Sequence, residues 1–366
     1  MKKEYIIPIF VPHLGCPHAC VFCNQNKISG EQRRVRANDV KETIEFYLNN
    51  FKDKDAKVEV AFFGGSFTAI NVDLQKELLE AANEYINQGL VDSIRISTRP
   101  DCINRDILKM LKKYKVKTIE LGVQSSNDYI LKKAERGHTF ANVKKASKLI
   151  NWYGFTLGHQ MMIGLPESTA LDEINTAKDL IKLKPKIVRI YPVLVIKGTK
   201  LEEMMEDGDY EPLTITQAVE RARDVASLFN RKKIKIIRIG LQNTDEITTP
   251  GDKNSQVVAG PFHPAFRQLV ETSMWYDAIV SKIKKFNTKV KEVEIKANSY
   301  DINNIIGHKK ENIEKLKEIY DVDVMVKIDE NMKNGEFEVE ILKTYDDILK
   351  ENLNKENAKK TQKQIN

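Results

Sequence analysis

The sequence predicts an α/β fold, in which a partial (β/α)6 barrel is followed by a small α+β module near the C-terminus. Two observations lead to this prediction. In the first 200 residues, short apolar stretches typical of buried strands alternate with amphipathic stretches of helical period. After residue 288 the pattern changes to strand, helix, helix, strand, strand. Repeated strand–helix units place successive strands parallel in one sheet, and six such units fit a partial barrel.

Each expected strand of the barrel is followed by a turn and, in most cases, by an expected helix. In folds of this kind the catalytic groups lie at the carboxyl ends of the strands. The short motifs after the strands are therefore where functional residues are expected. The predicted strands are 5–11, 58–64, 93–98, 118–123, 156–164 and 187–193, and the predicted helices are 39–49, 73–86, 105–114, 141–153 and 170–183.

The chain divides by pattern into four regions: a barrel (1–200), a barrel extension (201–285), a C-terminal module (288–348) and a tail (349–366). The extension contains a helical stretch, a strand at 234–239 and then a long loop crowded with Pro, Gly, Asn and Asp, which is a candidate lid. The tail has almost no apolar residues, which predicts a disordered segment or a frayed helix end.

Composition excludes some classes of protein. Of the 366 residues, 41% are apolar, and no run approaches the roughly eighteen uncharged residues of a membrane-spanning helix. The basic, apolar N-terminus is interpreted as a first strand and not as a signal peptide, because no cleavage site of small residues follows. Clustered cysteines then indicate metal binding in a reducing cytoplasm. The net charge of +7 is compatible with RNA as a partner but equally with an ordinary cytosolic protein.

Three of the four cysteines lie close together in the segment GCPHACVFC, directly after the first expected strand. Their spacing, Cys16-x3-Cys20-x2-Cys23, allows one loop to wrap an iron–sulfur cube while one iron stays open. A zinc knuckle completed by His13 or His18 is the alternative, although a closed zinc site usually takes two separated pairs of ligands. Phe22 precedes the last of these cysteines and is expected to shield the cluster from water.

Other strand ends carry polar or glycine-rich motifs. Gly64-Gly65-Ser66 ends the second strand, and two glycines allow a ligand to approach the backbone closely. Arg99, after the third strand, is suited to a carboxylate, or is a surface arginine before a turn. Gln124 ends the fourth strand, and a Gly164-Leu165-Pro166 turn ends the fifth. His138 is either a catalyst or a loop or capping residue, and His159 lies inside a strand, where it faces either the barrel interior or the helix layer. Cys102 lies outside the cluster motif and is interpreted as a small buried or loop residue, with a second cluster or a radical relay as the alternative role.

Taken in order, the motifs GCPHACVFC, GGSFT, STRPD, ELGVQS, RGH and MMIGLP resemble those of the radical S-adenosylmethionine (SAM) superfamily. Within it they look most like the branch that includes the radical domain of Elongator's catalytic subunit, a tRNA uridine-modifying enzyme. The resemblance covers about residues 5–200. No acetyl-CoA-binding signature is found, so the acetyltransferase domain of that subunit has no counterpart here. Residues 258–266 look instead like a segment of shorter, Elongator-like bacterial proteins.

The resemblance implies a TIM-type partial barrel holding one [4Fe-4S] cluster on Cys16, Cys20 and Cys23. It also implies that SAM binds the open iron and is cleaved to a 5′-deoxyadenosyl radical, with electrons from a donor such as flavodoxin or ferredoxin. The family's strand-end motifs correspond to cofactor-binding residues Gly64, Gly65, Ser66, Arg99, Gln124 and Gly164.

The C-terminal module resembles a KH domain, in which a GxxG loop between two helices clamps single-stranded nucleotides. The corresponding residues are Gly307, His308, Lys309 and Lys310, where Lys310 replaces the second glycine. We therefore expect a cytoplasmic radical SAM enzyme that modifies RNA, specifically tRNA. Two alternatives stay open: a radical SAM enzyme acting on a metabolite or peptide, and a non-enzymatic iron–sulfur or zinc protein that binds RNA.

Overall fold

The computed structural model describes residues 4–11, 20–23, 35–244 and 246–365. Its contacts divide the chain into two compact units, Met1–Pro264 and Ala265–Asn366. The boundary lies earlier than the one predicted near residue 285. Helix α10 (Phe266–Ile283) belongs to the second unit, because Ile279 and Val280 are buried in that unit's core. In the described part of the chain, no helix combines the length and apolar character needed to cross a bilayer.

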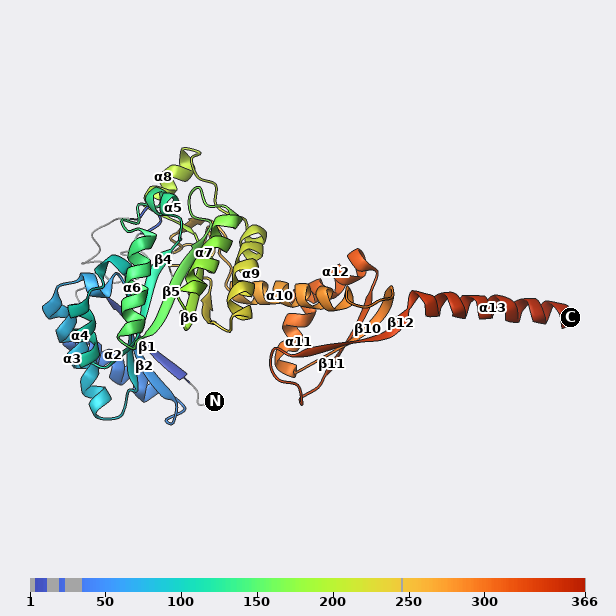
Figure 1. The fold of residues 1–366 in the computed structure, drawn as a ribbon, viewed down its shortest axis with the longest axis horizontal. Coiled ribbons are helices and arrows are strands. Elements are labelled where there is room, and N and C mark those ends of the chain that lie inside the picture. Colours follow the sequence, from blue (N-terminus) through green and yellow to red (C-terminus); the bar gives the residue numbers. More distant parts are fainter. Residues whose placement is uncertain (1–3, 12–19, 24–34, 245, 366) are drawn as a thin grey trace. The chain divides into compact units, whose positions relative to one another are not determined.

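The first unit is built on a curled sheet of seven strands (Figure 1). The strands follow the order β1-β2-β3-β4-β5-β6-β8, and every neighbouring pair is parallel. This confirms the predicted partial barrel, and the strand predicted at 234–239 joins the same sheet as an edge strand. The strands are β1 (Glu4–Val11), β2 (Lys57–Gly64), β3 (Ser93–Thr98), β4 (Val116–Gln124), β5 (Thr156–Ile163), β6 (Ile187–Pro192) and β8 (Lys235–Ile239).

Helices pack against the outer face of this sheet (Figure 1). Several begin at a residue whose side chain accepts a hydrogen bond from a backbone amide of the first turn, which satisfies a donor that the helix leaves unpaired. Asn104 does this for α4, Thr169 for α7 and Thr214 for α9. The helices are α2 (Ala37–Asn50), α3 (Val72–Asn87), α4 (Arg105–Lys113), α5 (Asp128–Lys133), α6 (Phe140–Trp152), α7 (Ala170–Lys182), α8 (Lys200–Glu206) and α9 (Ile215–Arg231).

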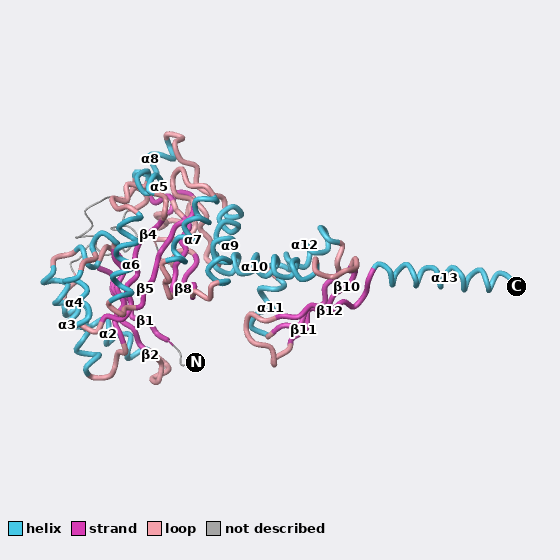
Figure 2. Tube along the Cα trace, viewed as in Figure 1, coloured by secondary structure: helices cyan, strands magenta, loops and turns pink. Residues whose placement is uncertain are grey.

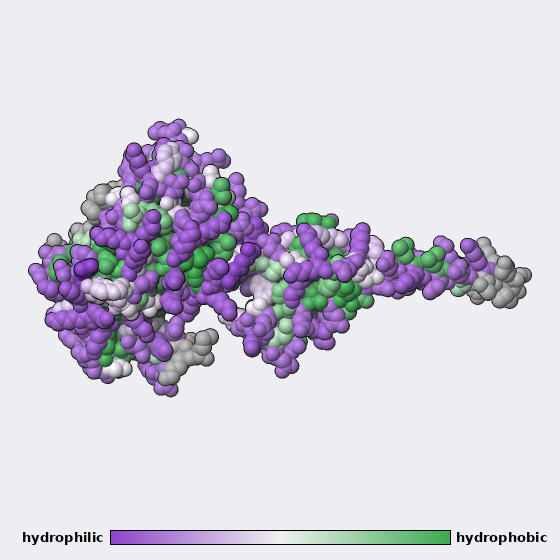
Figure 3. Space-filling model, in the orientation of Figure 1, coloured by the Kyte–Doolittle hydropathy of each residue, from purple (hydrophilic) through white to green (hydrophobic). Residues whose placement is uncertain are grey.

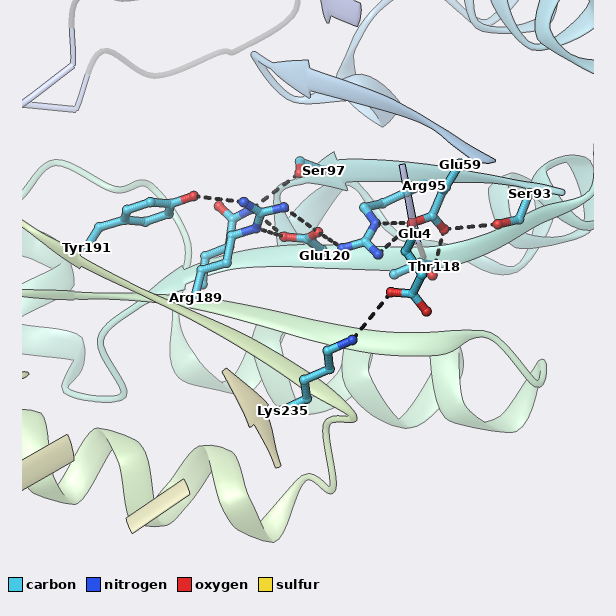
Figure 4. A network of polar contacts seen from close by, with 11 residues as sticks. Glu4, Glu59, Ser93, Arg95, Ser97, Thr118, Glu120, Arg189, Tyr191 and Lys235 are labelled. Carbon is cyan, nitrogen blue, oxygen red and sulfur yellow. Dashed lines mark hydrogen bonds and ion pairs between the residues drawn. The ribbon is translucent and has the colours of Figure 1, made fainter. Parts of the chain in front are cut away.

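The inner face of the sheet carries a connected polar network (Figure 4). At its centre Glu120 accepts hydrogen bonds from Arg189 Nε at 2.6 Å, Arg95 Nη1 at 2.8 Å and Gln160 Nε2 at 3.1 Å. Burial raises the pKa of Glu120, but the two guanidinium groups outweigh burial and hold that pKa below its ordinary value. Gly158 lies opposite Glu120 in the register, and a Cβ there would come within 2.9 Å of the Glu120 side chain. The network thus ties β3, β4, β5 and β6 together.

The sheet does not close into a full barrel, since β1 and β8 are its two edges. At the amino ends of these strands, however, Lys235 Nζ lies 3.4 Å from Glu4 Oε2. Both side chains are mostly exposed, so this ion pair contributes little stability. It nevertheless shows how far the sheet curls (Figure 4).

Part of the long loop of the barrel extension forms a short strand that pairs with another segment of the chain. Strand β9 (Val257–Ala259) runs antiparallel to β7 (Val195–Ile196). A small apolar cluster beneath the pair contains Leu194, Ile196, Ile247 and Val257. The loop therefore folds back onto the segment that follows β6.

The second unit contains a three-stranded sheet in the order β11-β10-β12 (Figure 2). Strand β10 is parallel to β11 and antiparallel to β12. Helices α10, α11 and α12 supply its apolar core together with the sheet, around the buried residues Val293, Ile295, Ile305 and Leu316. The elements are β10 (Val290–Ala297), α11 (Ser299–Ile306), α12 (Glu311–Tyr320), β11 (Asp323–Ile328), β12 (Phe337–Thr344) and α13 (Tyr345–Ile365).

The C-terminal tail is helical in the structure, whereas disorder or a frayed helix end is predicted from its composition. Helix α13 leads away from the sheet of its unit (Figure 1), and residues 349–360 are all exposed. Its sequence contains many lysines together with Glu, Gln and Leu, which favour helix without any packing partner. Figure 3 shows its surface as mostly hydrophilic, with a small apolar patch near its start.

Candidate active site

The cysteine motif follows β1 and reaches the described residues at Cys20. Cys20 is buried and Cys23 is half-buried, and the amide of Cys23 donates to the carbonyl of Cys20 at 2.9 Å. Cys16, His13 and His18 lie outside the described residues. The choice between a cube on three cysteines and a zinc site with a histidine is therefore not decided by the described geometry.

Val21, which follows Cys20, fixes the motif to the barrel. The amide of Val21 donates to Ala134 O at 3.2 Å, and its carbonyl accepts from the amide of Leu201 at 2.8 Å. Its side chain is buried in a core with Leu165 and Leu201, against which Phe22 also packs. Helices α5 and α8 therefore hold the cysteine segment at the carboxyl end of the sheet.

A guanidinium group lies directly on this segment. Arg136 Nη1 donates to Cys20 Sγ at 3.2 Å, and Nη2 donates to the carbonyl of Gly122 at 2.9 Å. Gly122 is required for this arrangement, because a Cβ at that position would lie 2.6 Å from Nη2. Arg136 belongs to the RGH motif but is absent from the predicted cofactor-binding residues. Burial of this arginine would have identified it as a candidate, but the RGH motif does not show whether its arginine is buried.

Two more polar side chains lie beside Arg136. Gln124 has a positive φ of 70°, and its pairing with β5 shifts register between Gly122 and Gln124, a local irregularity that redirects the side chain. Its Oε1 has no hydrogen-bond partner among the described residues, and neither does Arg136 Nε, whereas the ring of His138 lies close to the backbone of Val123. Burial, with the charges of Arg136 and Arg99, lowers the pKa of His138 to about 3, so its ring is neutral.

The glycine pair of the second strand has a structural role that its motif does not reveal. Gly64 has a φ of 98°, and a Cβ on it would lie 2.6 Å from the carbonyl oxygen of Val11. The amide of Gly65 donates to the same oxygen at 3.0 Å. The close approach that requires glycine is therefore to the backbone of β1, at the last residue of that strand before the chain leads to the cysteine motif.

Ser66 and Arg99 already have partners within the protein. Ser66 Oγ lies 2.8 Å from Thr98 Oγ1 and accepts from the Arg99 amide at 3.1 Å. Arg99 is buried and forms a two-pronged ion pair with Asp101, at 3.1 and 3.0 Å. These residues join the ends of β2 and β3. Cys102 is half-buried in the short turn that follows, and its carbonyl accepts from Thr68 Oγ1 at 2.9 Å.

The turn after β5 is held from three sides. Gly164 has a φ of 78°; its amide donates to Glu173 Oε1 at 2.7 Å, and its carbonyl accepts from the Tyr210 hydroxyl at 2.8 Å. A Cβ on Gly164 would come within 2.9 Å of Leu213. His159, in contrast, faces the helix layer, where its Nε2 pairs with Ser147 Oγ of α6 at 2.9 Å. It is therefore not part of the site.

Comparison with known proteins identifies the family. A model of the radical SAM superfamily matches residues 10–181, and a model of the radical SAM C-terminal domain matches residues 185–276. An uncharacterized protein of Methanocaldococcus jannaschii is 32% identical over 234 residues, which are 61% of this chain and 71% of that protein. The chain belongs to the radical SAM superfamily. It is accordingly an enzyme, and its cofactors are a [4Fe-4S] cluster and SAM.

Two further relatives confirm the predicted likeness to the Elongator branch of the radical SAM enzymes. The tRNA uridine(34) acetyltransferase of Methanocaldococcus infernus is 29% identical over 258 residues, 59% of this chain and 48% of that enzyme. The structure of Elp3 from M. infernus, with residues 1–46 deleted, matches with a TM-score of 0.59 at 24% identity. That match covers 77% of this chain and 64% of the other. The chain thus spans only about half of the acetyltransferase's length.

The described residues fit the cofactors of a radical SAM enzyme. A cluster held by thiolates is anionic and is tuned by hydrogen bonds to its sulfurs, so the guanidinium that donates to Cys20 Sγ is suited to such a cluster. The side chains of Gln124 and Arg136 both approach Gly122. Gln124 Oε1 and Arg136 Nε are buried without a partner among the described residues, so they offer hydrogen-bonding capacity that a polar ligand would satisfy. When bound, the two cofactors would together supply radical chemistry.

Proposed function

We propose that this chain is a radical SAM enzyme that modifies RNA, specifically tRNA, in the cytoplasm. The observation that carries the catalytic part is the contact of buried Arg136 with Cys20, beside buried polar atoms that have no partner in the described protein. A folded protein pairs nearly all such atoms, so unpaired atoms of Gln124 and Arg136, next to a cysteine of the motif, support a ligand at this place.

In this proposal Cys16, Cys20 and Cys23 hold the cluster. Gln124 and Arg136 face SAM, and Gly164 shapes the turn beside it. Gly64 and Gly65 fix the β1 end that leads into the cysteines, while Ser66 and Arg99 act as positioning residues through Thr98 and Asp101. The electron is supplied by a small redox protein of the flavodoxin or ferredoxin class.

The RNA part rests on the second unit and on the relatives that are named as tRNA enzymes. The elements of that unit follow the expected order of strand, helix, loop, helix, strand, strand. In the loop, Lys309 and Lys310 have φ values of 49° and 66°, so Lys310 adopts a backbone conformation that glycine favours. The loop therefore presents two cations and His308 to solvent, which supports contact with a phosphate backbone.

The test is the release of 5′-deoxyadenosine by anaerobically reconstituted, reduced protein given SAM, with and without tRNA. We expect tRNA to raise the yield several-fold and Cys20→Ala to abolish it. Gln124→Ala should lower it in both conditions. Gly64 is a poor target for this test, because a side chain there disturbs the β1 backbone before it affects a ligand.

Substitutions in the second unit separate RNA from other substrates. Lys309→Glu with Lys310→Glu should remove the tRNA stimulation and leave the basal yield intact. The matched control is Lys327→Glu with Lys333→Glu, which changes the charge equally at exposed positions away from the loop. A yield that never responds to tRNA would favour a metabolite or peptide substrate. A protein that binds zinc and forms no product would refute the enzymatic proposal.

A further inference from the structure

The amino ends of three barrel strands carry an unusual repeated feature. Helices α4, α7 and α9 each end two residues before a lysine in the left-handed backbone region, and a strand begins shortly after that lysine. The three residues are Lys115, Lys184 and Lys233, with φ values of 58°, 56° and 55°. Their amides donate to the third residue back, which closes each helix in the same way.

Glycine is the usual residue at this position, since a side chain is strained in the left-handed conformation. This chain follows that rule after α3 and α6, where Gly89 and Gly154 have φ values of 75° and 80°. Other side chains also occur in this conformation, such as Glu135 after α5. The conformation is therefore not the signal. The feature that points to a function is the recurrence of lysine at this left-handed position, three times at the same end of one sheet.

These lysines belong to three short segments, 112–117, 182–186 and 231–235, that contain no Asp or Glu. Lys182 and Lys235 form exposed ion pairs with Asp179 and Glu4. Within the described residues, the other cations of the segments have no carboxylate partner. All the cations are exposed, and they are Lys112, Lys113, Lys115, Lys117, Lys182, Lys184, Lys186, Arg231, Lys232, Lys233 and Lys235.

Hydrogen bonds connect the segments into one surface, which we call the amino-end rim. Lys112 Nζ donates to Tyr153 O at 3.0 Å, and Asn151 Nδ2 donates to Leu183 O at 3.1 Å. The amide of Lys235 donates to Lys186 O at 3.2 Å. The rim thus runs across β4, β5, β6 and β8.

An exposed aromatic residue lies in the middle of the rim. Trp152 is 73% exposed and stands edge-on to Tyr153, with ring centroids 4.9 Å apart. It belongs to the α6 end that the two hydrogen bonds connect to the lysine segments on either side. Cations on both sides of an exposed aromatic ring are suited to a polyanion that also offers bases for stacking.

Lysines near helix C-termini also interact with the helix dipole, which is the simpler explanation of the rim. That effect fades within the last turn, whereas Lys117, Lys186 and Lys235 lie in or next to the strands beyond it. The loop before β2 provides a contrast, because its lysines alternate with Asp53 and Asp55. The unbalanced charge is therefore concentrated at the β4–β8 part of the sheet.

We propose that the amino-end rim binds the phosphate backbone of a folded RNA. The rim lies at the opposite end of the strands from Cys20 and Gln124, and a strand of eight or nine residues spans about 25–30 Å. An RNA that contacts both ends must be at least that long, as a folded tRNA is and a single nucleotide is not. This inference rests on RNA as the substrate class given under Proposed function, but binding alone tests it.

The decisive variant is Lys115→Gly, Lys184→Gly and Lys233→Gly in the full-length protein. Glycine relieves the left-handed conformation, so the thermal unfolding midpoint should not fall. Equilibrium binding of a tRNA transcript is measured at several salt concentrations. We expect a weaker affinity at every salt concentration, and a slope of log K against log salt that is about two to three units shallower, since each lost phosphate contact removes about 0.7–0.9.

The matched control is Lys144→Gln, Lys145→Gln and Lys148→Gln, which removes three charges from the exposed side of α6. It should change the salt slope little. Fluorescence provides an independent readout: in a Trp275→Phe background only Trp152 remains, and tRNA should quench it.

Unchanged affinity and salt slope in the glycine variant would overturn the proposal and leave the rim to another anionic partner. An equal loss in the α6 control would also overturn it, because charge anywhere would then suffice. A lower unfolding midpoint with unchanged RNA binding would favour the helix-dipole explanation. If the rim variants weaken RNA binding while tRNA never stimulates 5′-deoxyadenosine release, the rim assignment holds and the proposed substrate fails.

Discussion

Arg136 and Gln124 share the space above Gly122, and each depends on the missing side chain there. A Cβ at Gly122 would lie 2.6 Å from Arg136 Nη2 and 3.3 Å from Gln124 Nε2. The glycine in the Glu-Leu-Gly-Val-Gln motif is thus what lets a guanidinium reach Cys20. At the residue scale, the polar groups of the site differ in whether another group of the protein already forms a hydrogen bond or ion pair with them. Ser66 and Arg99 are paired, whereas Gln124 Oε1 has no partner in the part of the chain that the structure describes.

His159 makes the stability of the barrel depend on pH. Burial lowers its pKa to about 3 from the ordinary 6.5, and its Nε2 pairs with Ser147 Oγ. Between these pH values the unfolded chain binds a proton that the folded chain does not. The stabilisation is therefore complete above about pH 6.5 and is lost as the pH falls. We expect a decrease of up to about 1.4 kcal/mol in unfolding free energy per pH unit from this residue.

Urea unfolding of wild type and His159→Gln between pH 7.5 and 4.5 measures the effect. The variant should lose stability less steeply with acid, because glutamine does not titrate. His138 has a lowered pKa for a similar reason, so part of the slope should remain in the variant. Identical slopes for the two proteins would contradict a buried neutral His159.

At the scale of elements, the loop between α11 and α12 contains two residues with positive φ, of which one has no room for a side chain and the other carries an exposed side chain. Gly307 has a φ of 81°, and a Cβ on it would lie 2.7 Å from the Glu311 side chain and 3.1 Å from Thr272. Lys310 has a φ of 66° and is exposed. Beneath the loop, Asn312 Nδ2 donates to the carbonyls of Thr272 and Ile305. The loop is therefore fixed from the α10 side and open on the other.

We expect Lys310→Gly to raise the unfolding free energy of this unit by up to about 1 kcal/mol, because glycine adopts the left-handed conformation without strain. Gly307→Ala, three residues away, should lower it by more, through both strain and crowding. Thermal unfolding of the two variants measures this contrast. Destabilisation by Lys310→Gly would mean that the lysine side chain makes contacts that matter to the fold.

At the scale of the whole molecule, the two units each have a sheet and an apolar core of their own. The second unit buries Val293, Ile295, Ile305 and Leu316 between its sheet and three helices. A unit of about a hundred residues with one core is large enough to fold by itself.

We therefore expect residues 265–366, produced alone, to unfold in a single cooperative transition. Circular dichroism on heating and the dispersion of amide resonances measure this. The same segment begun at residue 285 lacks α10 and should be largely unfolded, since Ile279 and Val280 are part of the core. A cooperative transition in the shorter segment would show that α10 is dispensable.

The sequence by itself determined the order of elements and the kind of chemistry. Strand and helix periods are local properties, so the six barrel strands were predictable, and cysteine spacing limits the metal centre that a single loop can hold. The structure alone revealed that β8 joins the same sheet, that α10 belongs to the second unit and that Arg136 lies on Cys20. Each of these depends on which distant surfaces pack together.

The same distinction applies to the amino-end rim. Its lysines are visible as three separate runs in the sequence, but their runs are about 45 to 70 residues apart. They form one surface only because parallel strands align their amino ends along one edge of the sheet. The sequence shows that these residues are lysines, whereas only the tertiary fold brings the three segments close together.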